Sequence, residues 1–148
     1  MEKNVGKTSS PVITMVSTKQ NSNTHSEAPA ASYGSATAYA LSFKGKSPYQ
    51  WGGTSPAGFD CSGFVQYVYR HFVKSLPRTT TQQEKAGKVI PTGQAQAGDL
   101  YFWGSHGGTF HVAIALGGGS YVHAPAPGQN VSTGSVGSYT PSFAVRVH

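Results

Sequence analysis

Hydrophobic residues recur every three or four positions between residues 61 and 76, which is the spacing of a helix that turns one face to a core. They are Phe64, Val65, Val68, Tyr69, Phe72, Val73 and Leu76. Asp60 or Ser62 can cap the start of this helix, and Pro77 ends the pattern because proline cannot continue a helix. The pattern therefore predicts a core-facing helix over residues 61–76.

The second half of the chain changes to the alternating or continuous apolar runs of β-strands. Strands are predicted at residues 99–103, 111–116, 120–124 and 143–147. A lesser helix is expected at residues 36–43, and a short one near residues 80–86 within an otherwise polar connection over 77–98. One long helix, one or two short helices and then a sheet indicate an α+β fold.

The first 31 residues have a different composition from the rest of the chain. They contain no aromatic residue and are rich in Ser, Thr and Asn, so they cannot bury enough apolar surface to offset the entropy lost on ordering. We expect a flexible tail or linker over 1–31 and one folded domain over 32–148. A domain of this size can bury a core without disulfides or metal ions.

The net charge of the chain gives limited information about which class of partner it binds. Eleven Lys and Arg against five Asp and Glu give a formal net charge of +6. The basic residues are spread rather than gathered in an arm, so we expect no nucleic-acid partner. The excess charge serves either solubility or attraction to a polyanion such as a bacterial wall or a membrane surface. No stretch approaches the roughly 18 apolar residues of a membrane span, and the N-terminus lacks the apolar core of a secretion signal. We expect either a chain that does not use that export route or a piece of a longer protein.

Cys61 is the only cysteine of the chain and therefore cannot form an internal disulfide. It begins the predicted long helix, where the helix dipole favours an anion. A thiol has an unperturbed pKa of about 8.5, and a helix N-terminus together with an imidazolium lowers that pKa. The sequence thus predicts a nucleophile held as a thiolate–imidazolium pair.

Glycines 117–119 separate two predicted strands and signal a hairpin. A three-residue loop would pair Leu116 with Ser120 and make His111 and His123 diagonal neighbours on one face, roughly 7 to 8 Å apart. A loop of two or four residues would place the two histidines on opposite faces. The three-residue loop is the prediction that brings the histidines together.

In that arrangement Cys61 attacks, His111 takes its proton, and His123 holds the far nitrogen of His111. We expect the small Ala113 and Ala115, on the histidine face, to let the Cys61 helix pack closely there. Taken singly, each of the three residues is better explained as a buried hydrophobic thiol or an ordinary histidine. Their joint occurrence reverses that preference, and the remaining histidines are expected in loops or solvent: His25, His71, His106 and His148.

A zinc site is the competing chemistry for the same histidines. It would combine Asp99 and His106 with His111 and His123, but neither an HExxH motif nor paired cysteines is present. The glycine runs match no phosphate-binding loop either. We therefore expect no metal ion and no organic cofactor.

These motifs together resemble the NlpC-type cysteine peptidases, a papain-like family that cuts the stem peptides of bacterial cell walls. The matching segments follow the family's order and lie at residues 48–53, 60–64, 76–80, 98–102, 111–117 and 121–125. The resemblance runs from about residue 32 to the end. It implies a central antiparallel sheet packed against a helix that carries the nucleophilic cysteine at its N-terminus.

The resemblance also implies roles for the neighbours of Cys61. Tyr49 would lie beside the nucleophile and bind substrate or the developing oxyanion, together with the backbone amide of Cys61. Asp60 and Ser62 would contact substrate, although capping the helix explains them equally well. Without the family, Tyr49 would be interpreted as a loop aromatic that packs over Trp51.

Three further residues have two interpretations each. Arg78 is either a solvated loop cation or a structural clamp near the groove. Trp51 and Trp103 are either sugar-binding platforms or packing residues, and we predict packing for both because their surroundings are strand-like and apolar.

The resemblance implies a hydrolase of the thiol protease type: an endopeptidase that cleaves peptidoglycan stem peptides between γ-linked D-glutamate and the following diamino acid. We expect it to act as a monomer, outside the cell or in the wall. Two alternatives stay open. The same site could belong to an amidase at the sugar–peptide junction or to an acyl transferase, or the domain could be a non-catalytic wall-binding module.

Overall fold

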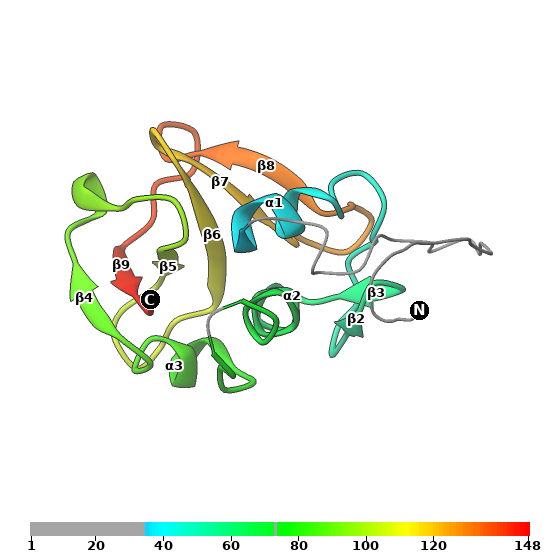
Figure 1. Cartoon of the computed structure of the whole chain (residues 1–148), viewed down its shortest axis with the longest axis horizontal. Helices are drawn as coiled ribbons and strands as arrows, with labels where there is room; N and C mark the ends of the chain where they lie inside the picture. Colours follow the sequence, from blue (N-terminus) through cyan, green and yellow to red (C-terminus); the bar gives the residue numbers. More distant parts are fainter. Residues whose placement is uncertain (1–34, 73) are drawn as a thin grey trace, which may run out of the picture.

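A sheet forms the centre of the molecule (Figure 1). The computed structural model describes residues 35–72 and 74–148, and within them the sheet has six strands in the order β4-β9-β5-β6-β7-β8, each antiparallel to its neighbours. The strands are β4 Lys88–Ile90, β5 Leu100–Trp103, β6 His111–Gly117, β7 Ser120–His123, β8 Ser132–Ser135 and β9 Phe143–Arg146. The tail predicted for 1–31 and the predicted domain start at residue 32 lie outside the described residues.

In the view of Figure 1, the helices and a small second sheet lie on both sides of β6. They are α1 Ala36–Leu41, α2 Cys61–Tyr69, α3 Thr80–Gln83, the 3₁₀ helix η2 Thr92–Gln94, and the strands β2 Thr54–Ser55 and β3 Gly58–Phe59. Both α1 and α2 contact β6, and the β2–β3 hairpin packs against α2. The predicted α+β architecture, with an antiparallel sheet against a helix that begins at Cys61, is confirmed. None of the helices in the described ranges has the length and hydrophobicity needed to cross a membrane.

The helix α2 is shorter than its apolar pattern predicts. It ends at Tyr69, where the amides of His71 and Phe72 bond the carbonyls three residues back, which tightens the last turn. Leu76 is still buried, but it enters the core from an extended segment whose carbonyl accepts a hydrogen bond from Gln66. The prediction of a helix to residue 76 is therefore wrong for residues 70–72 and 74–76, because periodicity alone does not distinguish a helical residue from a non-helical one that reaches the same core.

The two faces of the sheet carry separate hydrophobic clusters. The larger cluster joins α1 and α2 to the even-numbered residues of the central strands, among them Leu100, Phe102, Val112 and Ile114. The smaller cluster covers the opposite face and contains Tyr101, Trp103, Ala113, Ala115 and Tyr121. The Cys61 helix thus packs on the valine and isoleucine face of β6. The prediction that Ala113 and Ala115 receive this helix is wrong, because aromatic side chains from β5 and β7 fill the space above the alanines.

The hairpin between β6 and β7 has the predicted register at its histidines, but its turn differs from the predicted one. Ala115 pairs with Tyr121, as a three-residue loop would require, but Gly117 pairs with Ser120, so Leu116 does not. The loop therefore has two residues, Gly118 and Gly119, both with positive φ. An irregularity between Ala115 and Gly117 absorbs the extra residue, and the histidines remain on one face.

The other predicted strands and short helices are present, with small differences at their ends. The α3 helix begins with a capping box between Thr79 and Gln82. The short strands that sequence patterns did not predict include β4, within the presumed polar connection, and β8, at the other edge of the sheet.

Candidate active site

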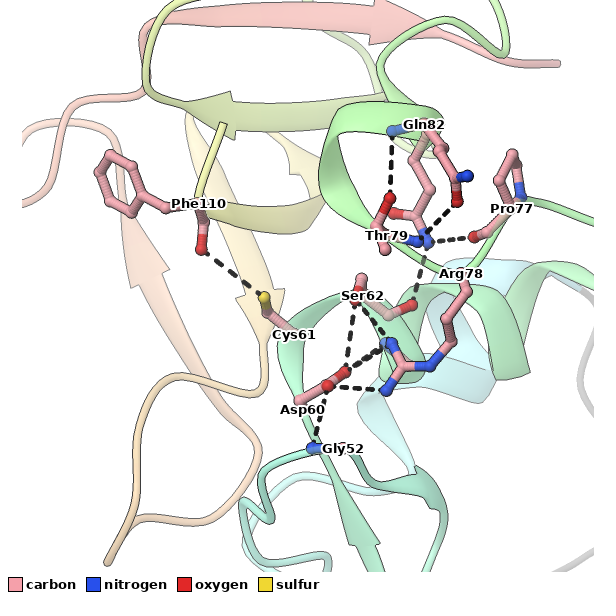
Figure 2. Close-up of polar contacts among 11 residues, drawn as sticks. Gly52, Asp60, Cys61, Ser62, Pro77, Arg78, Thr79, Gln82 and Phe110 are labelled. Carbon is pink, nitrogen blue, oxygen red and sulfur yellow. Dashed lines mark hydrogen bonds and ion pairs between the residues drawn. The ribbon is translucent and has the colours of Figure 1, made fainter. Parts of the chain in front are cut away.

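Cys61 is the first residue of α2 and lies where β6 begins (Figure 2). Its thiol donates a long hydrogen bond to the backbone carbonyl of Phe110, with Sγ and the oxygen 3.9 Å apart. Phe110 immediately precedes His111, the first residue of β6. The sulfur is partly exposed, so the chain presents a thiol at the start of the strand that carries the predicted base.

The surroundings of Cys61 favour the neutral thiol. Burial raises the pKa of this thiol, and the negative charge of Asp60 raises it further. Hydrogen bonds from backbone amides, including that of Val112, lower the pKa in part. These causes favour a neutral thiol at rest over the predicted thiolate.

His111 and His123 form a direct pair. Nε2 of His111 lies 2.7 Å from Nδ1 of His123, and the two side chains belong to residues only 7% and 8% exposed. Burial lowers the pKa of His111 to about 3, with a contribution from His123, and burial lowers the pKa of His123 to about 4. The predicted contact between the histidines is confirmed, and the lowered pKa values favour neutral rings near pH 7 over the imidazolium of the predicted ion pair.

Aromatic rings fix both imidazoles in place. The Trp103 ring lies 5.0 Å from that of His111, and the Tyr121 ring lies 5.0 Å from that of His123. Tyr139 stacks on the other side of this group, 4.7 Å from Trp103 at an interplanar angle of 18°. Sequence analysis did not select Tyr139, since a single tyrosine in a Ser- and Thr-rich loop carries no pattern.

Asp60, Ser62 and Arg78 form a second polar group, here called the clamp (Figure 2). Arg78 donates to both carboxylate oxygens of Asp60 at 2.7 and 3.0 Å and to Oγ of Ser62 at 2.8 Å. Asp60 also caps α2 by accepting from the amide of Gly63 at 2.7 Å, and it accepts from the amide of Gly52 at 3.2 Å. The clamp ties the nucleophile's helix to two loops, and Arg78 is not a free solvated cation.

Tyr49 lies within electrostatic reach of the nucleophile. Burial raises the pKa of its hydroxyl, the charges of Cys61 and Asp60 raise it further, and Arg78 lowers it. The backbone of Tyr49 is held by a hydrogen bond from its amide to the carbonyl of Gln129 and by a bridge to Phe59. The hydroxyl of Tyr49 is therefore protonated near pH 7.

The two tryptophans differ from each other. Trp103 is 2% exposed, as predicted for a packing residue, whereas Trp51 is 85% exposed and its predicted packing is wrong. Trp51 lies in a tight turn closed by the Gly53 amide and the Gln50 carbonyl, and Gly52 has φ of +74°. The turn directs the indole into solvent, and its 85% exposure does not support the alternative that Tyr49 packs over Trp51.

The side-chain carboxylates of residues 35–72 and 74–148 all have internal partners. Asp60 is held in the clamp, Glu84 accepts from Thr109 and Gly107, and Asp99 pairs with Arg146 and His148. His148 is exposed and lies outside any helix or strand, as expected, and it also pairs with Asp99 at 2.8 Å. Within the same ranges, no three His, Cys, Asp or Glu side chains gather in a way that could hold a metal ion.

A thiol at the start of a helix, packed where a strand begins with a histidine that a second histidine orients, defines a papain-like α+β domain. The sequence model of the NlpC/P60 family matches residues 45–146, and the chain belongs to this family.

Two curated relatives and one solved structure show how close the resemblance is. Protein P54 of Enterococcus faecium is 61% identical over 99 residues, which are 66% of this chain and 19% of P54. The γ-D-glutamyl-L-lysine dipeptidyl-peptidase of Bacillus subtilis is 41% identical over 87 residues, 57% of this chain and 29% of that protein. The crystal structure of the NlpC/p60 domain of the peptidoglycan hydrolase SagA is 52% identical with a TM-score of 0.73, covering 80% of this chain and 98% of that one. The chain thus spans less than a third of these two curated relatives but nearly all of the solved domain.

Proposed function

We propose that this domain is a cysteine endopeptidase that hydrolyses stem peptides of bacterial peptidoglycan. The observation that carries the proposal is the 2.7 Å contact between His111 and His123, at the start of the strand beside which Cys61 lies. A paired imidazole next to a thiol is the arrangement in which the second group orients the base and the base activates the nucleophile.

Proton transfer accompanies attack in the proposed reaction, because both partners are neutral at rest. With Nε2 of His111 bonded to His123, Nδ1 of His111 is the nitrogen left to take the proton of Cys61. The sulfur forms a bond to the substrate carbonyl carbon, and the resulting imidazolium then protonates the departing amine as the C–N bond breaks. Water, deprotonated by His111, releases the acid from the thioester and restores the thiol.

Donors for the developing oxyanion are available on the clamp side. The proposal assigns this role to the backbone amide of Cys61, at the N-terminus of α2, and to the hydroxyl of Tyr49. The raised pKa of Tyr49 keeps this hydroxyl protonated and able to donate. Asp60 and Ser62 are proposed to border the substrate, and because Arg78 occupies both carboxylate oxygens, Asp60 acts chiefly by positioning the nucleophile's helix.

The bond proposed for cleavage joins γ-linked D-glutamate to the following diamino acid. The names of the Bacillus and SagA relatives, a γ-D-glutamyl-L-lysine dipeptidyl-peptidase and a peptidoglycan hydrolase, support this choice. The location of such a substrate places the activity outside the cell or in its wall, and we propose that a monomer suffices because each candidate group comes from one chain.

Mass spectrometry of the products tests the proposal. Purified protein and its Cys61→Ala variant are incubated with peptidoglycan, and we expect new fragments that end at D-glutamate with the parent only. The exposed Val89, on the edge strand β4, offers a matched control, since Val89→Ala should give the parent's products.

The rival functions give different products. An amidase would release the entire stem peptide from the glycan, and a transferase would add the mass of the accepting amine. A wall-binding module would retain the wall in a pull-down with parent and Cys61→Ala alike and would yield no fragments, which would contradict the proposal.

A further inference from the structure

Tyr139 presents a rigid aromatic surface in the loop between β8 and β9. The residue is 43% exposed, while one face of its ring stacks on the buried Trp103. The backbone amide of Tyr139 donates to the carbonyl of Ser135 at 3.1 Å. The hydroxyl of the following residue, Thr140, donates to the carbonyl of Val136 at 2.7 Å. The ring is therefore held in one place with its other face accessible.

This surface adjoins the candidate base. The rings of Tyr139 and His111 are 6.2 Å apart, and both contact Trp103. Burial raises the pKa of Tyr139, and the charge of Cys61 raises it further, so the phenol stays protonated.

The two tyrosines, Tyr49 and Tyr139, have different neighbours. Tyr49 is the one that interacts with Asp60 and Arg78, whereas Tyr139 belongs to the group around His111. In the proposed reaction His111 gives its proton to the departing amine, so the amine's residue lies on the His111 side. Tyr139 is consequently next to the residue that follows the scissile bond.

That residue is a diamino acid, whose side chain ends in an ammonium group. Within the described ranges no side-chain carboxylate is free to receive it, because Asp60, Glu84 and Asp99 are all engaged. The face of a tyrosine ring attracts a cation within about 6 Å of its centroid, and such contacts contribute severalfold to binding. The exposed face of Tyr139 supplies a site of this chemistry.

We propose that Tyr139 is a specificity-determining residue that binds the free side-chain ammonium of the diamino acid after the scissile bond. This inference rests on the proposed function and adds to it a preference for stems whose diamino acid is not acylated, that is, not cross-linked.

Two synthetic peptides test the inference: L-Ala-γ-D-Glu-L-Lys-D-Ala and the same peptide with an acetylated lysine side chain. We expect the parent to cleave the free-amine peptide with roughly fivefold higher kcat/KM, as a single cation–π contact would give. Tyr139→Leu should bring the ratio of the two kcat/KM values close to one, and Tyr139→Phe should keep the ratio because the ring is retained.

Trp51→Leu is the matched control, since it removes an exposed aromatic residue on the clamp side and should leave the ratio as it is in the parent. Alkylation of Cys61 by iodoacetamide checks that the variants keep their site. A ratio unchanged in Tyr139→Leu, including the case in which both peptides are cleaved equally more slowly, would overturn the inference alone. Failure of the parent to cleave either peptide would overturn the proposed function and this inference with it.

Discussion

The two polar groups beside Cys61 differ in charge, although Asp60 and Ser62 are as buried as the two histidines. The clamp contains an ion pair, with Arg78 and Asp60 joined at 2.7 Å, whereas the pair of His111 and His123 has pKa values lowered to about 3 and about 4 and is neutral. The difference lies in the partners. Asp60 has a cation to compensate its charge, while among the described residues the polar partner of each histidine is the other imidazole. A buried charge without a counter-ion is costly.

This contrast separates two tasks within the site. The clamp uses its charges to hold α2 and two loops in place, and its hydrogen-bonding capacity is largely filled. The histidine pair keeps its proton-accepting capacity because it is not already protonated. We therefore expect the clamp to tolerate changes that preserve its geometry and the pair to tolerate changes that preserve its neutrality.

The sharpest test of the neutral pair compares two substitutions at His123. His123→Ala leaves Nε2 of His111 without its partner at 2.7 Å, and we expect kcat/KM to fall roughly 100-fold. His123→Asn offers a neutral carbonyl oxygen to the same N–H and should stay within about tenfold of the parent. Steady-state kinetics on a defined stem peptide measures both variants, and an asparagine variant as slow as the alanine one would show that the pair does more than orient His111.

The pH dependence of stability is the next largest effect. The pKa values of His111 and His123 in the folded state lie below the usual value of 6.5. Below about pH 6.5 the unfolded chain therefore binds more protons at these two residues than the folded chain does. Stability is then fully present above about pH 6.5 and decreases as the pH falls toward 4 and 3, by at most about 2 kcal/mol per histidine between pH 7 and 5.

Urea unfolding at the two pH values measures this loss in the parent and in His123→Asn. The variant lacks one of the two titrating groups, so its loss of stability should be smaller by about one histidine's contribution. Equal losses in both proteins would mean that the pair is not held neutral in the fold.

The fold could be predicted as far as its apolar patterns are strong. The four apolar strands and the start of α2 at Cys61 were predicted, because a buried strand and a capped helix have local signals. The edge strand β8, with sequence Ser-Thr-Gly-Ser, has no apolar signal and is a strand because β7 pairs with it. The end of α2 was missed for a related reason, since Leu76 reaches the core without being helical.

The candidate site was predicted in its residues but not in its ionisation. The proximity of His111 and His123 was predicted from the strand register. That register is correct although the predicted loop length is wrong, because the irregularity between Ala115 and Gly117 compensates for the shorter loop. Ionisation depends on which groups meet in space. Asp60 pairs with the guanidinium of Arg78, which is eighteen positions away in the sequence. No local sequence pattern indicates which charged side chains lie beside Cys61 and His111 in the folded domain.

The smallest expected effect comes from removing the positive charge of the clamp. Arg78→Met removes the cation but leaves the carboxylate of Asp60 beside Cys61, where its charge raises the pKa of the thiol. We expect alkylation of Cys61 at a fixed pH to slow severalfold. Stability should fall by about 1 kcal/mol, a modest value because the Arg78 side chain is 35% exposed and water partly replaces it.

A second change at Asp60 distinguishes charge from geometry in that result. Asp60→Asn in the Arg78→Met background removes the uncompensated charge while keeping an oxygen to accept from the Gly63 amide. Alkylation should then recover, and a double-mutant cycle gives the coupling between the two residues. If the double variant reacts as slowly as Arg78→Met, the clamp acts on Cys61 by holding α2 in place, and the charges of Asp60 and Arg78 do not set the pKa of the thiol.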